Sequence, residues 1–132
     1  MVIVLDTHTW LWWASDPGQL GAAARRAISR ESSRGGAVVS SISAWEVAVK
    51  VAAGKLELDR DVHAWVAAAC ALPGLVVHPL QPVDAVESTL LPGPLHRDPA
   101  DRIIIALARR LGAAIATRDE AIRQYPHVKT VW

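Results

Sequence analysis

Short apolar runs alternate with longer stretches of helical periodicity along this chain. Runs rich in β-branched and aliphatic residues, bounded by polar or turn-forming residues, predict strands. These runs cover residues 2–5, 37–39, 75–78, 113–117 and 128–131. Between them, apolar positions recur with the spacing of an amphipathic helix. The predicted helices cover residues 7–14, 20–32, 45–51, 61–72, 82–91, 99–111 and 120–125.

This order of elements predicts the fold class. Strands that alternate with helices favour a parallel sheet covered by helices on both faces. We therefore predict an α/β fold, a three-layer α/β/α sandwich with a mainly parallel five-stranded central sheet. The length of 132 residues, without a repeat or an interdomain linker, predicts a single domain over residues 1–132.

Composition narrows the range of protein classes to which this chain could belong. Hydrophobic residues make up 52% and charged residues 20%, which supplies a core and excludes a disordered chain. The net charge of +1 is no strong nucleic-acid signature, although near-neutrality can conceal an acidic pocket inside a basic rim. The single cysteine, Cys70, excludes an internal disulfide, and we expect it to be a small core residue. No apolar run is long enough to span a membrane, so we expect a cytoplasmic protein.

Four acidic residues occupy positions where an α/β chain would bring them together. Asp6 ends the first predicted strand, Asp119 follows the fourth, Glu46 lies one turn into a helix, and Asp101 lies near the head of a buried helix. Ligands of open parallel sheets bind beyond the carboxyl ends of the strands. Crowded carboxylates repel one another unless they are protonated or held by a cation. Oxygen ligands of this kind predict a site for Mg²⁺ or Mn²⁺.

Each acidic residue also has a local structural explanation. Asp6 and Asp119 could cap the helices that follow them. Ser43 and Glu46 fit the Ser-x-x-Glu capping box, in which the carboxylate binds backbone donors. Asp98 precedes Pro99 and could cap its helix or assist the metal site, and we favour capping.

Several motifs together resemble a known family. The matching segments are Val4-Leu5-Asp6-Thr7-His8, Ser43-Ala44-Trp45-Glu46-Val47-Ala48-Val49-Lys50, Gly54-Lys55-Leu56, His96-Arg97-Asp98-Pro99-Ala100-Asp101-Arg102-Ile103-Ile104-Ile105-Ala106 and Thr117-Arg118-Asp119. In their order and spacing they resemble PIN-domain ribonucleases, specifically the VapC-type toxins of bacterial type II toxin–antitoxin pairs.

The resemblance implies a function and a set of partners. It places the family's acidic quartet on Asp6, Glu46, Asp101 and Asp119 and implies metal-dependent hydrolysis of RNA phosphodiester bonds. It also implies a homodimer and a cognate antitoxin, whose tail covers the acidic groove and places a cation among the carboxylates.

Other side chains near these motifs could contact RNA. The cations that could meet phosphates are Lys50, Lys55, Arg97, Arg102 and Arg118. The tryptophans that could stack on bases are Trp10, Trp12, Trp13 and Trp45, although core or subunit packing explains them better. His8 and His96 are close enough in sequence to touch substrate. Thr7 and Thr117 could hydrogen-bond a ligand or water, but a role in turns explains them better.

Two rival functions remain open. One is a non-catalytic PIN-like module that binds RNA or protein. The other is a phosphatase with an aspartyl nucleophile, which the Asp6-Thr7-His8 sequence weakens because it lacks a second Asp two residues on. A receiver-type signalling module is excluded because the third strand ends in His78-Pro79 rather than in a phospho-accepting Asp.

Overall fold

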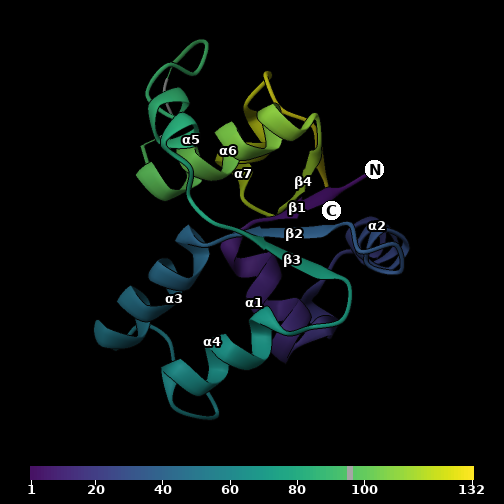
Figure 1. The fold of residues 1–132 in the computed structure, drawn as a ribbon, viewed down its shortest axis with the longest axis vertical. Helices are drawn as coiled ribbons and strands as arrows, with labels where there is room; N and C mark the ends of the chain where they lie inside the picture. Colours follow the sequence, from purple (N-terminus) through teal and green to yellow (C-terminus); the bar gives the residue numbers. More distant parts are fainter. Residues whose placement is uncertain (95–96) are drawn as a thin grey trace.

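Five strands form one sheet in the computed structural model, which describes residues 1–94 and 97–132 (Figure 1). The strands are β1 (Ile3–Leu5), β2 (Ala37–Ser40), β3 (Leu75–His78), β4 (Ala114–Ala116) and β5 (Thr130–Val131). Their order across the sheet is β3-β2-β1-β4-β5, and every described pair of neighbours is parallel. The carboxyl ends of all these strands therefore point to the same edge.

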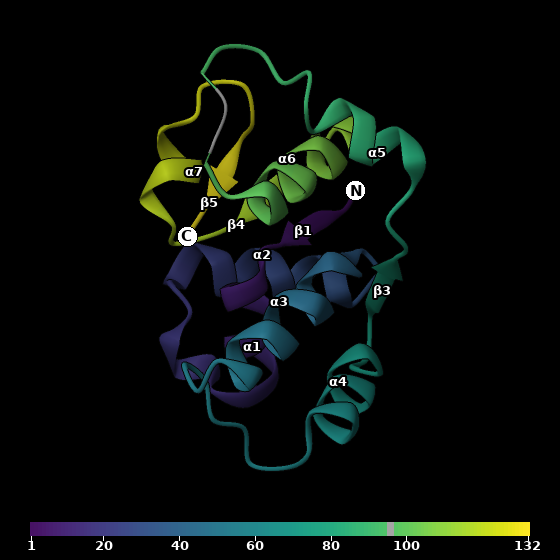
Figure 2. The same ribbon diagram turned by 90° about the vertical axis from the view of Figure 1, so that its left-hand side faces the viewer.

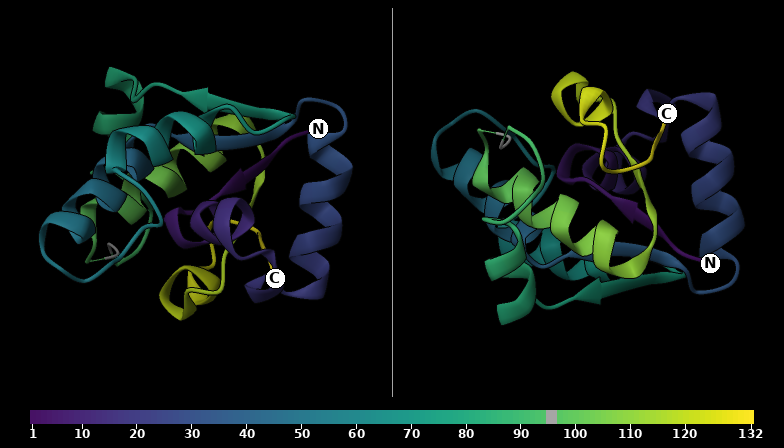
Figure 3. Two further views of the ribbon diagram at one scale, coloured as in Figure 1. Left: turned by 90° about the horizontal axis from the view of Figure 1, so that it is seen from below. Right: turned by 90° about the horizontal axis from the view of Figure 1, so that it is seen from above.

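Helices lie on both sides of the sheet (Figures 1 and 2). They are α1 (Thr7–Ser15), α2 (Ala22–Ser32), α3 (Ile42–Ala52), α4 (Val62–Cys70), α5 (Pro82–Glu87), α6 (Pro99–Leu111) and α7 (Glu120–Gln124), with a 3₁₀ turn at Pro17–Gln19. Helices α5, α6 and α7 lie on one side, and α1, α2 and α4 on the other. Helix α3 contacts both α1 and α6. Helix α2 runs beside both chain termini (Figure 3).

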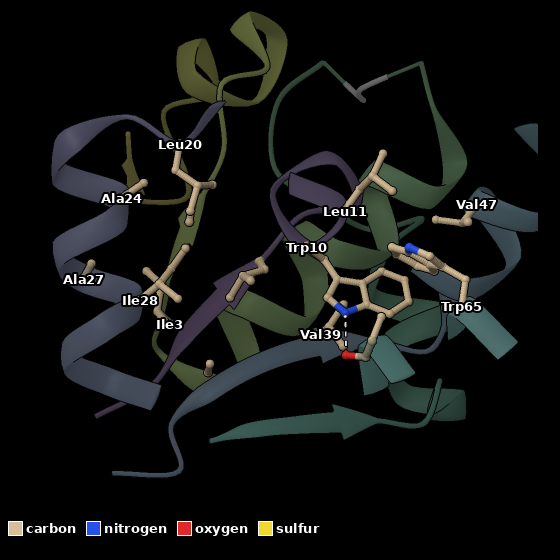
Figure 4. Close-up of a cluster of buried hydrophobic side chains, with 14 residues drawn as sticks. Ile3, Trp10, Leu11, Leu20, Ala24, Ala27, Ile28, Val39, Val47 and Trp65 are labelled. Carbon is tan, nitrogen blue, oxygen red and sulfur yellow. Dashed lines mark hydrogen bonds between the residues drawn. The ribbon is translucent and has the colours of Figure 1, made fainter. Parts of the chain in front are cut away.

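Successive residues of the strands enter opposite cores, because side chains alternate between the two faces of a strand. Ile3 and Leu5 belong to a first core, which includes Trp10 of α1 (Figure 4). The indole of Trp10 donates a hydrogen bond to the carbonyl oxygen of Ala69 at 3.1 Å. Val4 belongs to the second core, with the apolar residues of α6. Both faces of the sheet are covered, so the predicted α/β/α fold class is confirmed.

The end of α5 differs from the prediction. The sequence predicts a helix over residues 82–91, but α5 ends at Glu87. Beyond it, the backbone amide of Thr89 donates to the carbonyl of Val86 at 3.0 Å, an i→i−3 turn. The hydroxyls of Ser88 and Thr89 also bond backward, to the carbonyls of Ala85 and Val86. Such local bonds compete with helix propagation.

Two smaller expectations also need correction. The fifth strand covers only Thr130–Val131 rather than residues 128–131. Cys70 is partly exposed and packs against the first core instead of lying fully inside it. Within residues 1–94 and 97–132, every helix falls short of the length and apolar character needed to cross a bilayer.

Candidate functional site

The pairing of β1 with β4 brings Asp6 and Thr117 together. Leu5 is in register with Ala116, so the next residues, Asp6 and Thr117, emerge side by side at the carboxyl edge of the sheet. The hydroxyl of Thr117 donates a hydrogen bond to Oδ2 of Asp6 and accepts one from the backbone amide of Asp119 at 2.9 Å. One threonine therefore connects two of the predicted acidic residues.

Asp6 and Asp119 both cap helices, as their positions in the sequence suggested. Oδ1 of Asp6 accepts a hydrogen bond from the amide of Thr9 at 2.9 Å, at the start of α1. Oδ2 of Asp119 accepts one from the amide of Ile122 at 2.9 Å, at the start of α7. Each cap uses one oxygen of a two-oxygen group, so capping does not exclude a second role for either carboxylate.

Ser43 and Glu46 do not form the capping box that their spacing suggested. The hydroxyl of Ser40 accepts a hydrogen bond from the amide of Ile42 at 3.2 Å, and α3 begins there, ahead of Ser43. The Ser43 hydroxyl lies 2.8 Å from the hydroxyl of Thr7. Glu46 also turns to Thr7, whose hydroxyl donates to its Oε1. A contact between α1 and α3 thus replaces the local motif.

Glu46 meets two acidic residues at the head of α6. One carboxylate oxygen from each of Glu46, Asp98 and Asp101 lies within 4.8 Å of the other two. Asp98 also caps α6, since its Oδ1 accepts from the amides of Ala100 at 2.8 Å and Asp101 at 3.3 Å. Asp98 therefore both caps the helix and stands among the candidate ligands, whereas the sequence had favoured capping.

Electrostatics connect this group with Asp6 and Asp119. The pKa of Asp101 is raised to about 8, mainly by burial and then by the charges of Asp98, Glu46, Asp119 and Asp6. The pKa of Glu46 is raised chiefly by burial, and the nearby charges of Asp98 and Asp6 act in the same direction. The hydrogen bond from Thr7 and the charge of Lys50 oppose that rise. We call these five residues, Asp6, Glu46, Asp98, Asp101 and Asp119, the acidic cluster.

Some of the predicted cations border the acidic cluster. Nζ of Lys50 lies 3.3 Å from Nε2 of His8. The pKa of His8 is lowered, chiefly by burial and then by the charge of Lys50. The charge of Arg118 acts in the same direction, whereas the charges of Asp6 and Asp119 oppose the shift. The guanidinium of Arg118 lies over the ring of Trp12, 4.6 Å from its centroid.

The other predicted contacts are more scattered. Arg97 and Lys55 are exposed and Arg102 is partly buried, while His96 lies outside the described residues. Trp10 is buried as expected, whereas Trp12 and Trp13 are only partly buried. Trp45 is 59% exposed, so the core of this chain does not contain it.

The sequence did not predict the contacts that three hydroxyl groups make in the site. Thr7 and Thr117 were assigned to turns, yet they donate to the carboxylates of Glu46 and Asp6. Ser43, assigned to a cap, contacts Thr7 instead. The available signal was position: Thr7 directly follows Asp6, and Thr117 directly follows the fourth predicted strand.

Known proteins resemble this chain over nearly its whole length. The PIN domain family matches residues 3–128. Ribonuclease VapC22 of Mycobacterium tuberculosis (strain ATCC 25618 / H37Rv) is 31% identical over 136 residues, which cover 98% of each chain. Among solved structures, VapBC2 from Rickettsia felis bound to a DNA fragment from their promoter gives a TM-score of 0.69 at 12% identity, covering 99% of this chain and 98% of that one. DNA-bound VapBC from Salmonella typhimurium gives 0.67 at 16% identity, covering 99% and 97%. The chain therefore belongs to the PIN-domain family and is a VapC-like member of it.

Proposed function

We propose that this chain is a divalent-metal-dependent endoribonuclease that hydrolyses RNA phosphodiester bonds as the toxin of a toxin–antitoxin pair. The observation that carries the proposal is the convergence of the acidic cluster, in which oxygens of Glu46, Asp98 and Asp101 lie within 4.8 Å of one another. A relative that is 31% identical over 98% of the chain is named a ribonuclease, which supports the same activity.

The acidic cluster fits a hard divalent cation. All its charged groups are carboxylates, the ligands that Mg²⁺ and Mn²⁺ prefer. The pKa of Asp101 is raised first by burial and then by the like charges around it, and a bound cation would offset that repulsion. We assign metal binding to Asp6, Glu46, Asp101 and Asp119, with Asp98 as a further ligand. A bound ion would lower the pKa of a water molecule and offset negative charge on the reacting phosphate.

The residues of the chain itself orient this site. The Thr9 amide and the Thr117 hydroxyl fix both oxygens of Asp6. Thr7 holds Glu46 and favours its charged form. Such supporting hydrogen bonds keep ligands aligned and tune their charge. Lys50 and Arg118, next to the acidic cluster, would contact RNA, and Arg97, just before α6, and Arg102, within it, would extend this contact.

We further propose two protein partners. A cognate antitoxin would inhibit the enzyme by placing a cationic side chain among the carboxylates, where it would compensate the same charge as a metal ion. The two similar structures are DNA-bound VapBC assemblies, which supports such a pairing. The second partner is another copy of this chain, in a homodimer.

The decisive experiment is RNA cleavage by folded protein that is free of antitoxin. Total RNA would be incubated with Mg²⁺, with Mn²⁺ and with chelator. We expect cleavage only with metal, and a loss of about 100-fold or more for Asp6→Asn and Asp101→Asn. Asp59→Asn is the matched control, because Asp59 is exposed and pairs with Arg60.

Two results would overturn the proposal. Intact RNA under every metal condition would favour a non-catalytic binding module. A phosphoryl group on Asp6, detected by mass spectrometry, would favour the phosphatase.

A further inference from the structure

A pocket of about 340 Å³ opens beside the acidic cluster. It is lined by Asp6, His8, Trp12, Arg118, Asp119 and Glu120. Two of these residues, Asp6 and Asp119, belong to the acidic cluster, so the pocket directly adjoins the place proposed for the reacting phosphate. The other lining residues combine two rings, a cation and a carboxylate.

Planar groups are gathered around Trp12. The guanidinium of Arg118 lies 4.6 Å from the centroid of the indole. The ring of His8 lies 5.5 Å from the indole at an interplanar angle of 42°. The ring of Trp132 lies 5.8 Å away at 58°. We call these four residues the aromatic platform.

The aromatic platform is anchored to the body of the protein. Trp12 and Trp132 are partly buried against the first core. Trp132 also lies against the backbone of Gly21. A Cβ added to Gly21 would come within 2.6 Å of the carbonyl carbon of Trp132. His8 and Trp12 project from α1, whose first residues follow Asp6. Helix α1 therefore sets the position of His8 and Trp12 relative to Asp6.

The charged residues that line and border the pocket indicate which part of an RNA strand would bind there. The carboxylates of Asp6, Asp119 and Glu120 would repel a phosphate placed inside the pocket. The side chain of Lys50, 3.3 Å from the ring of His8, offers a phosphate a position at one border. A nucleobase is uncharged and planar, and aromatic rings and guanidinium planes are the surfaces on which unpaired bases stack.

We propose that Trp12 and Arg118 form a subsite for one unpaired nucleobase, next to the phosphodiester bound at the acidic cluster. This inference rests on the proposed function, because it supposes an RNA substrate. It assigns to Trp12 a positioning role, since the ring would hold a nucleotide rather than take part in hydrolysis. Arg118 contributes a second planar surface and a positive charge.

The test measures binding without cleavage. A fluorescein-labelled single-stranded RNA octamer would be titrated in chelator and followed by anisotropy, next to an octamer with abasic nucleotides throughout. We expect Trp12→Leu to weaken binding of the normal octamer by about tenfold, in line with the loss of one stacking contact. The abasic octamer should bind wild type and Trp12→Leu equally. Trp13→Leu is the matched control, because Trp13 follows on the same helix but lines a different pocket.

Arg118 provides a second variant that leaves the core intact, because its side chain is exposed. We expect Arg118→Leu to weaken binding of the normal octamer more than binding of the abasic octamer. Circular dichroism would establish that each variant is folded. Equal affinities of wild type, Trp12→Leu and Arg118→Leu for the normal octamer would overturn the subsite. So would equal losses on both octamers, because these would indicate backbone contact alone.

Failure of the proposed function gives a different result. If wild-type protein binds the octamer through Trp12 in chelator but leaves RNA intact with Mg²⁺ and Mn²⁺, the nuclease proposal fails and the subsite stands. If RNA is cleaved with metal but Trp12→Leu changes neither affinity nor the positions of cleavage, the subsite fails and the nuclease stands.

Discussion

The hydroxyl of Thr117 donates a hydrogen bond to Oδ2 of Asp6, across the junction of two neighbouring parallel strands. The same hydroxyl oxygen accepts the backbone amide of Asp119. Although these residues lie near opposite ends of the chain, their separation is set by the register of β1 and β4. The geometry of the acidic cluster therefore depends on an uncharged side chain that binds no metal in our proposal.

Thr117→Val removes this connection with little change in volume. We expect cleavage and Mg²⁺ affinity to fall by about 10–100-fold, as for other losses of hydrogen bonds behind a metal ligand. Cleavage rates at a series of Mg²⁺ concentrations would show the change. Thr89→Val, in the exposed turn after α5, should retain wild-type values. Wild-type behaviour of Thr117→Val would mean that Asp6 is aligned without this hydroxyl.

Thr7→Val tests the support of Glu46. The Thr7 hydrogen bond holds the pKa of Glu46 down against burial, so its removal should raise that pKa further. The midpoint of Glu46 ionisation should therefore move to higher pH in metal-free protein. A pH titration of the Glu46 side-chain ¹³C resonance would measure the shift, with Thr130→Val as the control. A midpoint that stays constant or falls would contradict the hydrogen bond.

The raised pKa of Asp101 predicts how stability depends on pH without metal. A carboxyl group whose pKa is higher in the folded chain than in the unfolded chain binds more protons when folded. Protonated Asp101 therefore contributes its full stabilisation to the folded chain below pH 3.8, the ordinary pKa of the group. This stabilisation is lost as the pH rises through about 8, the pKa of Asp101 in the folded chain. Urea unfolding in chelator should show a smaller loss of stability over this range for Asp101→Asn than for wild type. Asp59→Asn, the control, should show the same dependence of stability on pH as wild type. The same dependence for Asp101→Asn would show that the pKa of Asp101 is not raised.

Gly74, directly before β3, provides a prediction about the fold. It has a φ of +80°, and a Cβ added there would lie 1.9 Å from the carbonyl oxygen of Ser32 at the end of α2. Gly35 has a similar φ of +72° with nothing within 4 Å of such a Cβ. Gly35→Ala should cost about 1–2 kcal/mol for the left-handed backbone. Gly74→Ala should cost about 1–3 kcal/mol more because of the clash. Equal midpoints in urea would refute the clash.

Much of this fold could be predicted because its pattern is local. The alternation of Ile3, Val4 and Leu5 between two cores follows from strand geometry and a sheet buried on both faces. The positions of Asp6 and Asp119 after strands likewise predicted their place at the carboxyl edge. Two acidic residues that follow neighbouring parallel strands must emerge at the same edge of the sheet.

The missed features depend on contacts between distant segments. Ser43 and Glu46 carry a valid local capping signal, but their contacts with Thr7 of α1 replaced it. Nothing in the sequence registers α1 against α3, so this outcome required the packed structure. The buried carboxylate of Asp84 is similar, since Arg110 of α6 binds it through two hydrogen bonds of 2.7 and 2.9 Å. That pair joins helices whose contact cannot be inferred from either residue alone.

The strand order β3-β2-β1-β4-β5 has a consequence for protein synthesis. The chain first extends the sheet away from β1 through β2 and β3, then returns to add β4 on the other flank of β1. A polypeptide emerging from the ribosome can therefore build one half of the sheet while Asp6 still lacks Thr117 and Asp119 beside it. Asp119 can join the other carboxylates only after β4 has been translated, so in our proposal a shorter nascent chain would lack a complete metal site and would spare the RNA that surrounds it.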